Sequence, residues 1–553
     1  MSMKNTILLV SAMCVTVQVA VAQNIDPTVE VTRGYKAELV DVHKPSMEMS
    51  VPDSVYKFDF AVDYTVADSP YGGAYEFSPY TMEMKPESLK EKPSVFYLNA
   101  GVGYTLHPTL DVLYSPALDG RFGVNLYGVH RSYVGDYRAA HVGKDVKGRA
   151  MSNGYDLMSG ASADMRYDWD KTAVDLGVSY YGVAVNDFLH KEDFNALDVN
   201  LSVKSKSQWS KSFMYDVSAA YRFGDNSEVR EHLVGLDVKF GPALSARHKV
   251  FVDAGTRFAT YQKLYEATFG NVYVRPRYHF EWKWFKADFG LRASYVYSLD
   301  ENFAQENQYV YPDIRLNCIV GKDVMRAYLN VTGGEELHTY SSLLERNHHF
   351  YTGYQVYGNA LLGASLVRVK PELGLEGRVT KFFSYDLRGG YSLNASSPVG
   401  TLIKLADGYY CPALAYSDHQ QCFAKFDWNL SLKSFRFDGS VKYTCTWGLS
   451  KSPASVYYVV PSQLTAEGSM VYNWNRRLYV GVDCQFASSA KTSNKDVYVP
   501  YYVDLGAFAE YSINRKLSVW LRGGNLMNME IQRNLLFAEK GINFTAGICL
   551  TLQ

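Results

Sequence analysis

The sequence has little charge and, after its start, no long hydrophobic run. Beyond residues 7–22, no stretch reaches the roughly 18 consecutive apolar residues that a transmembrane helix needs. Only 20% of the 553 residues are charged, the formal net charge is -1, and no basic stripe indicates nucleic-acid binding. If this chain crosses a membrane, it must therefore do so as a closed β-barrel.

Cysteine is also scarce, and its spacing excludes the usual zinc motifs. The sequence has seven cysteines and none are spaced as CxxC, so we predict no metal site and no cofactor. Cys411 and Cys422 flank what we interpret as one loop. In an oxidising compartment a disulfide between them is one option, and free thiols are the other.

Aromatic residues, in contrast, are abundant. The chain has 45 Tyr, 28 Phe and 8 Trp. Tyr and Trp concentrate where one end of the side chain is apolar and the other is wet, as at a bilayer interface. A large soluble β-sandwich or propeller can be rich in tyrosine as well, so composition leaves both classes open.

The N-terminus indicates export. Lys4 precedes an apolar stretch from Ile7 to Ala22 that ends in a small-x-small pattern. We predict a signal peptide over residues 1–22, with cleavage between Ala22 and Gln23.

Residues 23–93 differ in character from the rest of the chain. They hold seven of the 18 prolines, which favours an extended segment over a packed domain. Only Tyr56–Tyr64 alternates as a strand would. We interpret 23–93 as an extended, proline-rich periplasmic segment lying along or inside the barrel mouth; a poorly ordered leader is the alternative.

From residue 94 onward, apolar and polar residues alternate persistently. The closing run places Phe544, Ala546, Ile548, Leu550 and Leu552 on one face, with polar and small residues between them. Period two with one apolar face describes a strand between two solvents, and lipid as one of them gives an outer-membrane barrel. A propeller would show a blade repeat of roughly 40–50 residues, and this sequence has no such repeat.

We predict an all-β fold: a transmembrane antiparallel β-barrel over 94–553, with about 22 strands in a range of 14–22. Short connections such as 169–171 and 513–516 alternate with long ones, the asymmetry of bacterial barrels. The predicted long loops are Gly135–Asn153, Gly333–Gly358, Ser396–Gln421 and Ala487–Val497.

The C-terminal quarter resembles the barrel of TonB-dependent outer-membrane receptors. The resemblance rests on Tyr511–Val519, on Gly524–Asn528, and on Gly541–Phe544 with Gly547. Val379–Tyr391 resembles a strand pair of the same kind. Here Ile542 and Asn543 replace the usual residues after the glycine, and the chain ends in Gln553 rather than an aromatic.

The N-terminal part departs from those receptors, whose barrel encloses a plug of roughly 130 residues. About 70 proline-rich residues stand in its place, and Val29–Pro45 with Ala100–Tyr104 resembles a plug-less group of such barrels. Thr28, Val29, Glu30, Val31 and Thr32 resemble the short box that contacts TonB; a chance leader strand is the alternative.

No constellation indicates an enzyme, and we predict no catalytic residue. Glu345 with His348 and His349 is the nearest candidate for metal or acid–base chemistry, but a solvent-exposed loop cluster is the simpler interpretation. Five arginines fall on predicted strands, where they would either tune a lumen for anions or pair with lumen carboxylates; they are Arg222, Arg315, Arg326, Arg388 and Arg522.

The sequence thus supports two functions for a barrel in the outer membrane of a diderm bacterium. The first is receptor-like or porin-like transport of a solute. The second is a non-transporting accessory barrel in an outer-membrane complex. The partners expected are outer-membrane lipid and, through residues 23–93, TonB or another periplasmic or outer-membrane protein.

Overall fold

The computed structural model describes residues 95–552, except for 105–106, 117, 119, 147, 207–212, 264–265, 299–306, 321–324, 350–361 and 450–454. The chain divides into two units, Met1–Ser88 and Leu89–Gln553, and every described residue belongs to the second. The predicted proline-rich segment, the cleavage site at Ala22–Gln23 and Thr28–Thr32 lie outside the described residues. No described helix is long and apolar enough to cross a membrane.

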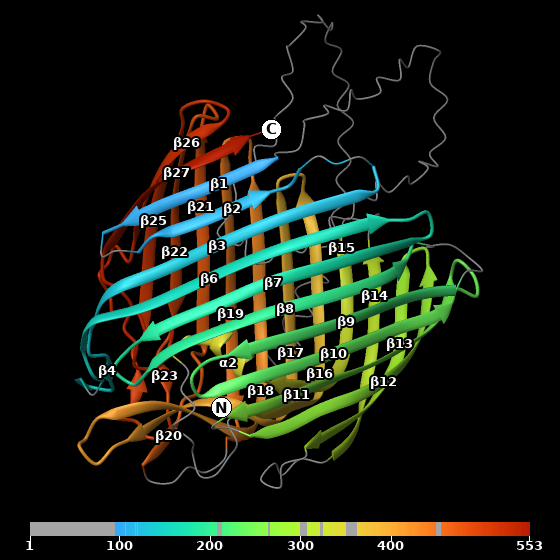
Figure 1. The fold of residues 1–553 in the computed structure, drawn as a ribbon, viewed down its shortest axis with the longest axis horizontal. Coiled ribbons are helices and arrows are strands. Elements are labelled where there is room, and N and C mark those ends of the chain that lie inside the picture. Colours follow the sequence, from blue (N-terminus) through green and yellow to red (C-terminus); the bar gives the residue numbers. More distant parts are fainter. Residues whose placement is uncertain are drawn as a thin grey trace, which may run out of the picture. The chain divides into compact units, whose positions relative to one another are not determined.

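The fold is a closed antiparallel barrel of 22 strands, as predicted (Figure 1). The barrel strands are β1 (Phe96–Gly103), β2 (Thr109–Tyr114), β3 (Phe122–Tyr137), β6 (Met151–Asp168), β7 (Thr172–Asn186), β8 (Lys191–Ser205), β9 (Phe213–Asp225), β10 (Val229–Pro242), β11 (His248–Lys263), β12 (Ala267–Trp282), β13 (Phe285–Ser298), β14 (Asn307–Val320), β15 (Met325–His338), β16 (Gly363–Thr380), β17 (Phe383–Lys404), β18 (Tyr410–Ser431), β19 (Phe435–Trp447), β21 (Leu464–Trp474), β22 (Leu478–Ala487), β25 (Tyr502–Ser512), β26 (Leu517–Gly524) and β27 (Asn543–Leu552).

The barrel closes where its first strand meets its last. β1 pairs with β27 in a register that runs from Phe96 opposite Leu552 to Gly103 opposite Thr545. Each of the other barrel strands pairs with its neighbours in sequence. Full closure removes the unpaired sheet edges that lipid could not solvate.

The two ends of the barrel differ in their connections. At one end, the turn end, the described links are short, such as 169–171, 381–382 and 475–477. Asn475 and Arg476 both have positive φ, the backbone that a tight hairpin matched to strand twist requires. At the opposite end, the loop end, the links include 138–150, 339–362 and 525–542.

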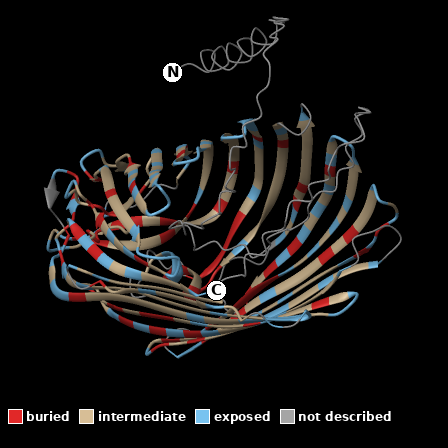
Figure 2. Cartoon of the chain, turned by 90° about the horizontal axis from the view of Figure 1, so that it is seen from above, coloured by how far each residue is buried: buried red, intermediate tan, exposed pale blue. Residues whose placement is uncertain are grey.

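The loop end also carries the remaining secondary structure, which gathers at the lower end of the barrel in Figure 1. β4 (His141–Val142) pairs with β5 (Asp145–Val146), and β23 (Ala490–Lys491) pairs with β24 (Tyr498–Val499). β20 (Val456–Tyr458) pairs with the end of β17, and α2 (Tyr340–Arg346) follows β15 directly. Buried residues form short bands along the strands rather than one central core (Figure 2).

The outer face of the barrel is apolar. In β27, Phe544, Ala546 and Ile548 are exposed, while Asn543 and Thr545 between them are buried on the lumen side. Elsewhere Val310 and Leu373 are 69% and 64% exposed. Side chains of this kind facing outward on a closed sheet fit lipid as the outer solvent.

Aromatic residues mark the turn end of this apolar surface. Trp169, Trp282, Trp284 and Trp474 all lie in or beside turn-end links and are exposed. They account for half of the eight tryptophans of the chain. Such a ring places the headgroup boundary of a bilayer close to the turns.

The strands depart from the sequence pattern in two places. The alternation does not reveal β6, because its outward residues Ala161, Ala163 and Met165 are small or unbranched and give a weak apolar signal. Residues 396–421 do not form a long loop: β17 and β18 continue through them to a link at 405–409.

The interpretation of Cys411 and Cys422 as flanking one loop fails for the same reason. Both lie on β18, eleven residues apart along an extended strand, and no disulfide joins them. At about 3.4 Å per residue their Cα atoms are much farther apart than a disulfide allows. Cys422 instead lies opposite Cys445 of β19, on the outer face.

Candidate functional site

The inner wall formed by β14–β19 is a polar surface built by strand pairing. Because lumen-facing residues of paired strands line up in rows across the sheet, one row contains Arg326, Glu376, Asp386 and Asp427. The next row toward the loop end contains Tyr328, Gly374, Arg388, Lys425 and Lys442.

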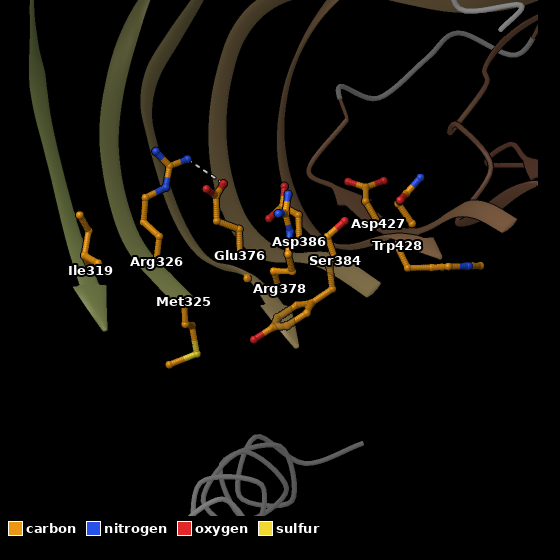
Figure 3. A pocket seen from close by; sticks show the side chains of 12 residues that line it. Ile319, Met325, Arg326, Glu376, Arg378, Ser384, Asp386, Asp427 and Trp428 are labelled. Carbon is orange, nitrogen blue, oxygen red and sulfur yellow. Dashed lines mark hydrogen bonds and ion pairs between the residues drawn. The ribbon is translucent and has the colours of Figure 1, made fainter. Parts of the chain in front are cut away.

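The first row lines a cavity of about 700 Å³ near the turn end (Figure 3). Arg326 donates to Glu376 at 2.6 Å, and Asp386 and Asp427 project from the neighbouring strands. The carboxylates of Asp386 and Asp427 both line this cavity.

The second row brings three cations side by side, and we call Arg388, Lys425 and Lys442 the cation row. Arg388 and Lys425 share Asp427, at 3.1 and 2.8 Å. Lys442 makes no ion pair with any described residue, and the charged groups that act on it are Lys425, Lys370 and Arg388. Like charges directly opposite each other on a sheet destabilise it, so the row is not explained by fold stability.

A second cavity lies on β14–β16, farther toward the loop end than the first. It has a volume of about 410 Å³ and is lined by Arg315, Asn330, Thr332, Lys370 and Glu372. The cation row lies on the neighbouring strands β17–β19, and Tyr328 and Gly374 of the same register row stand between the two cavities.

Other parts of the inner wall carry closed ion-pair networks. Asp253, only 4% exposed, accepts from Arg275 and Arg277, both at 2.7 Å. Arg275 also reaches Asp313 at 3.3 Å. Each of these arginines has a carboxylate partner, whereas Lys442 of the cation row has none among the described residues.

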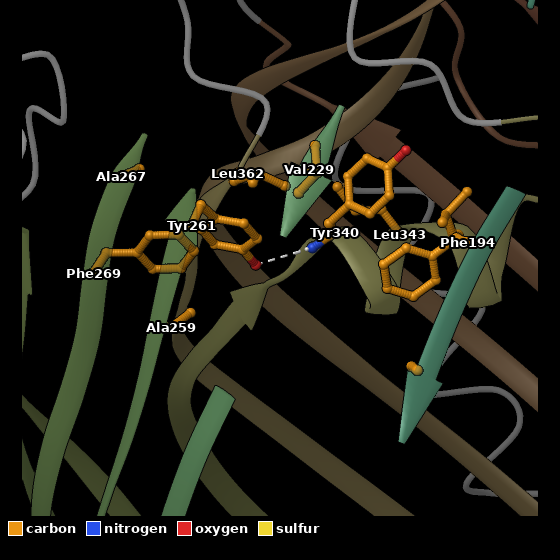
Figure 4. Packing of buried hydrophobic residues seen from close by; sticks show 11 residues of the cluster. Phe194, Val229, Ala259, Tyr261, Ala267, Phe269, Tyr340, Leu343 and Leu362 are labelled. Carbon is orange, nitrogen blue, oxygen red and sulfur yellow. Dashed lines mark hydrogen bonds between the residues drawn. The ribbon is translucent and has the colours of Figure 1, made fainter. Parts of the chain in front are cut away.

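Loops cover the wall at the loop end, and we call the described residues of 138–150, 339–349, 488–501 and 525–542 the cover. One of its contacts is made by α2, which begins at a capping box formed by Thr339 and Ser342. Tyr340, Leu343 and Leu344 form one buried cluster with Phe194 of β8, Tyr261 of β11 and Phe269 of β12. The ring of Tyr340 contacts Phe194, and Tyr261 lies between Tyr340 and Phe269 (Figure 4).

Two buried glutamates hold α2 against the wall. Glu231 of β10 is fully buried and accepts from Tyr261 Oη at 2.6 Å and Ser341 Oγ at 2.5 Å. Glu192 of β8 accepts from Tyr340 Oη at 2.6 Å. Burial raises the pKa of the Tyr340 hydroxyl and the charge of Glu192 raises it further, so this side chain stays a neutral donor.

A stack of rings fastens the other loops of the cover. The His349 and Phe537 rings lie 3.8 Å apart with an interplanar angle of 8°, and Phe537 stacks on Phe188 at 4.8 Å. Tyr137 of β3 meets His349 edge-on. Four separate parts of the chain therefore converge on one ring cluster.

Asp187 reinforces this cluster from the link between β7 and β8. Its carboxylate bonds His349 Nδ1 at 2.9 Å and accepts from the backbone of Leu189 at 2.7 Å. Burial would raise the pKa of Asp187, but its hydrogen bonds to His190 and His349 hold it well below the usual range.

The link between β26 and β27 is anchored through Arg533. Its guanidinium pairs with Glu539 and, at 2.7 Å, with Asp504 of β25. Burial would lower the pKa of Arg533, yet the charge of Glu539 and the hydrogen bonds raise it. Burial lowers the pKa of nearby Lys540.

The structure separates the three residues singled out as a metal or acid–base candidate. Glu345 faces Arg222, His348 bonds Asp156 at 2.9 Å, and His349 is buried in the ring cluster. The expected solvent-exposed loop cluster is therefore wrong for His349. Among the described residues, no group of three or more His, Cys, Asp or Glu side chains is placed to hold a metal ion.

Four of the five strand arginines pair with carboxylates, as one of the two expectations had it. Arg222 bonds Asp198 and Arg326 bonds Glu376, and the same holds for Arg315 with Asp313 and Arg388 with Asp427. Arg522 lies over the ring of Phe508. The lysines of the cation row and the buried glutamates were missed, because single charges on a strand give no sequence signal before the register is known.

No family model and no curated protein matches the sequence. Solved structures do match. The FrpB iron transporter from Neisseria meningitidis has a TM-score of 0.61 at 10% identity, covering 84% of this chain and 81% of its own. The siderophore receptor PirA from Acinetobacter baumannii has a TM-score of 0.56 at 12% identity, covering 83% and 80%. The copper transporter OprC has a TM-score of 0.58 at 11% identity, covering 83% and 80%. The chain therefore shares its barrel fold with these iron and copper transporters and this siderophore receptor.

Proposed function

We propose that this chain is an outer-membrane barrel of a diderm bacterium that moves a small polar solute across that membrane through its lumen. The observation that carries the proposal is the polar inner wall, with two cavities of about 700 and 410 Å³ set into a closed 22-strand barrel. Closure of the barrel alone does not require cavities in its inner wall. The transporters and receptors that share its fold support the same role.

Single-channel recording tests the proposal. The purified full chain and a variant lacking residues 23–92 are each inserted into planar bilayers. We expect the truncated variant to conduct ions, with short closures caused by the cover. Transport is refuted if neither protein forms a pore while both keep heat-modifiable gel mobility, the sign of an intact barrel.

Energised transport would need an N-terminal contact with TonB. The segment Thr28–Thr32 is the proposed contact, within an exported chain that begins at Gln23. A cysteine at position 30 should cross-link to the periplasmic domain of TonB, whereas a cysteine at position 73 should not. Equal cross-linking at the two positions would contradict a specific box.

The accessory role remains the second candidate, and the cover is the observation that favours it. Contacts such as Glu231 with Ser341 and His349 with Phe537 close the loop end tightly. If the chain is an accessory barrel, pull-down should recover a partner that depends on residues 23–92. No partner with the full chain, or the same partners without that segment, would remove this candidate.

A further inference from the structure

The lumen wall gathers four cations on β16–β19, beside its two cavities. The patch contains four cations: the cation row of Arg388, Lys425 and Lys442, together with Lys370 on β16. Three carboxylates face them, since Asp427 pairs with Arg388 and Lys425, Asp386 lies 3.8 Å from Arg388, and Glu372 lies 3.9 Å from Lys370. Of the four cations, Lys442 is the one that makes no ion pair with any described residue.

The position of Lys442 makes that charge accessible. Its side chain is exposed on the lumen side of β19, opposite Lys425 of β18 and Thr465 of β21. No described carboxylate pairs with it. Lysine presents three donors on a flexible stem, which suits an oxyanion that arrives from water.

The surroundings of the cation row favour a ligand over a purely structural role. Three cations in register repel one another, and nothing in the pairing of β17, β18 and β19 requires them there. The Nζ atom of Lys370 lies 5.7 Å from the centroid of the Phe423 ring. This cation–π contact holds the Lys370 side chain beside the cation row. Space for a ligand exists beside Asp427 in the larger cavity and beside Lys370 in the smaller one.

We propose that the cation row and Lys370 form a binding site for the phosphate or carboxylate groups of a small anionic solute. This inference rests on the proposed transport function and names the class of solute: a soluble polyanion that passes along the β16–β19 wall. The site lies on the lumen side of the wall, so the oxyanion comes from free solute and not from the headgroups of the surrounding lipid.

Calorimetric titration of the detergent-solubilised full chain tests the site, with inorganic pyrophosphate and citrate as probes. The test variants are Lys442→Gln and the double variant Lys425→Gln with Lys442→Gln. The matched control is Lys204→Gln, because Lys204 is also on a strand but is already paired with Asp175 at 2.9 Å. Removing one exposed charge should weaken binding by about two- to fivefold, and the double variant by roughly tenfold.

The outcomes separate this inference from the proposed function. Weaker binding in the row variants but not in Lys204→Gln supports the site, and the difference should shrink at high salt. Equal binding in all variants, or no binding to the unaltered chain, overturns it. A pore without probe binding refutes only the anion site, whereas probe binding without a pore in the truncated chain refutes only transport. Lys442→Glu gives a second check, since it should abolish binding while leaving the heat-modifiable mobility intact.

Discussion

The hydrogen bonds of Glu231 to Ser341 and Tyr261, which we call the latch, give the sharpest test of what holds α2 against the wall. Replacing Glu231 with Leu keeps the volume of the side chain but removes the acceptor for Tyr261 Oη and Ser341 Oγ. Both hydroxyls and the backbone amide of Ser341, at 3.3 Å from the carboxylate, then lose a charged acceptor in a buried site.

The magnitude follows from those three bonds. A hydrogen bond to a charged group contributes about 1.5–3 kcal/mol, and burying a carboxylate costs several kcal/mol that the variant no longer spends. We therefore expect the closed state of α2 to lose about 2–4 kcal/mol. Since 1.4 kcal/mol is a factor of ten, local opening should become roughly 30- to 700-fold more frequent.

Hydrogen exchange followed by mass spectrometry measures that opening. The amides of Leu343 and Asn347 donate to Thr339 O at 3.0 Å and to Leu343 O at 2.9 Å, so peptides over 338–349 report on the helix. The control is Glu336→Gln, because Glu336 pairs with Arg346 at the exposed surface, where an ion pair contributes little. Unchanged exchange in Glu231→Leu, or an equal increase in Glu336→Gln, would refute the latch.

Three further predictions concern other parts of the barrel. Leu373→Arg should destabilise the barrel in lipid vesicles by about 2–4 kcal/mol, measured by urea unfolding, because Leu373 faces the membrane; no effect would contradict the assigned outer face. Phe537→Ala should speed amide exchange across 525–542 while leaving 338–346 protected, because it removes the ring stacked on His349; exchange that stays slow would show that the stack is not needed. Mild oxidation should join Cys422 to Cys445, detected by peptide mapping, because the two thiols lie opposite each other on paired strands; cross-linking of either to another cysteine would contradict the register.

The architecture was accessible from the sequence because lipid and water impose opposite demands on alternate residues. Phe544, Ala546 and Ile548 reveal their strand without any knowledge of the partner strand. Where the outward residues are small, as at Ala161 and Ala163 of β6, the same rule gives no signal. The strands β17 and β18 were cut short because beyond the membrane their alternation no longer separates lipid from water.

The candidate site was not accessible in the same way. Lys425 and Lys442 are 17 positions apart in sequence and become neighbours only through the register of β18 and β19. Glu231 and Ser341 are separated by 110 positions, and His349 and Phe537 by more. Contacts of this kind depend on how loops return to the wall, which hydrophobic period does not encode.

The strands differ greatly in length around the barrel, and the surrounding lipid has to follow them. β17 and β18 have 22 residues each, whereas β1 and β26 have eight and β2 has six. A tilted spanning strand needs about 9–11 residues, so the short strands beside the closure fall below the thickness of an ordinary bilayer. Lipid tails next to β1 and β2 must therefore compress or splay, while those beside β17 and β18 stay relaxed. We therefore expect this protein to deform the bilayer most at the closure between β1 and β27.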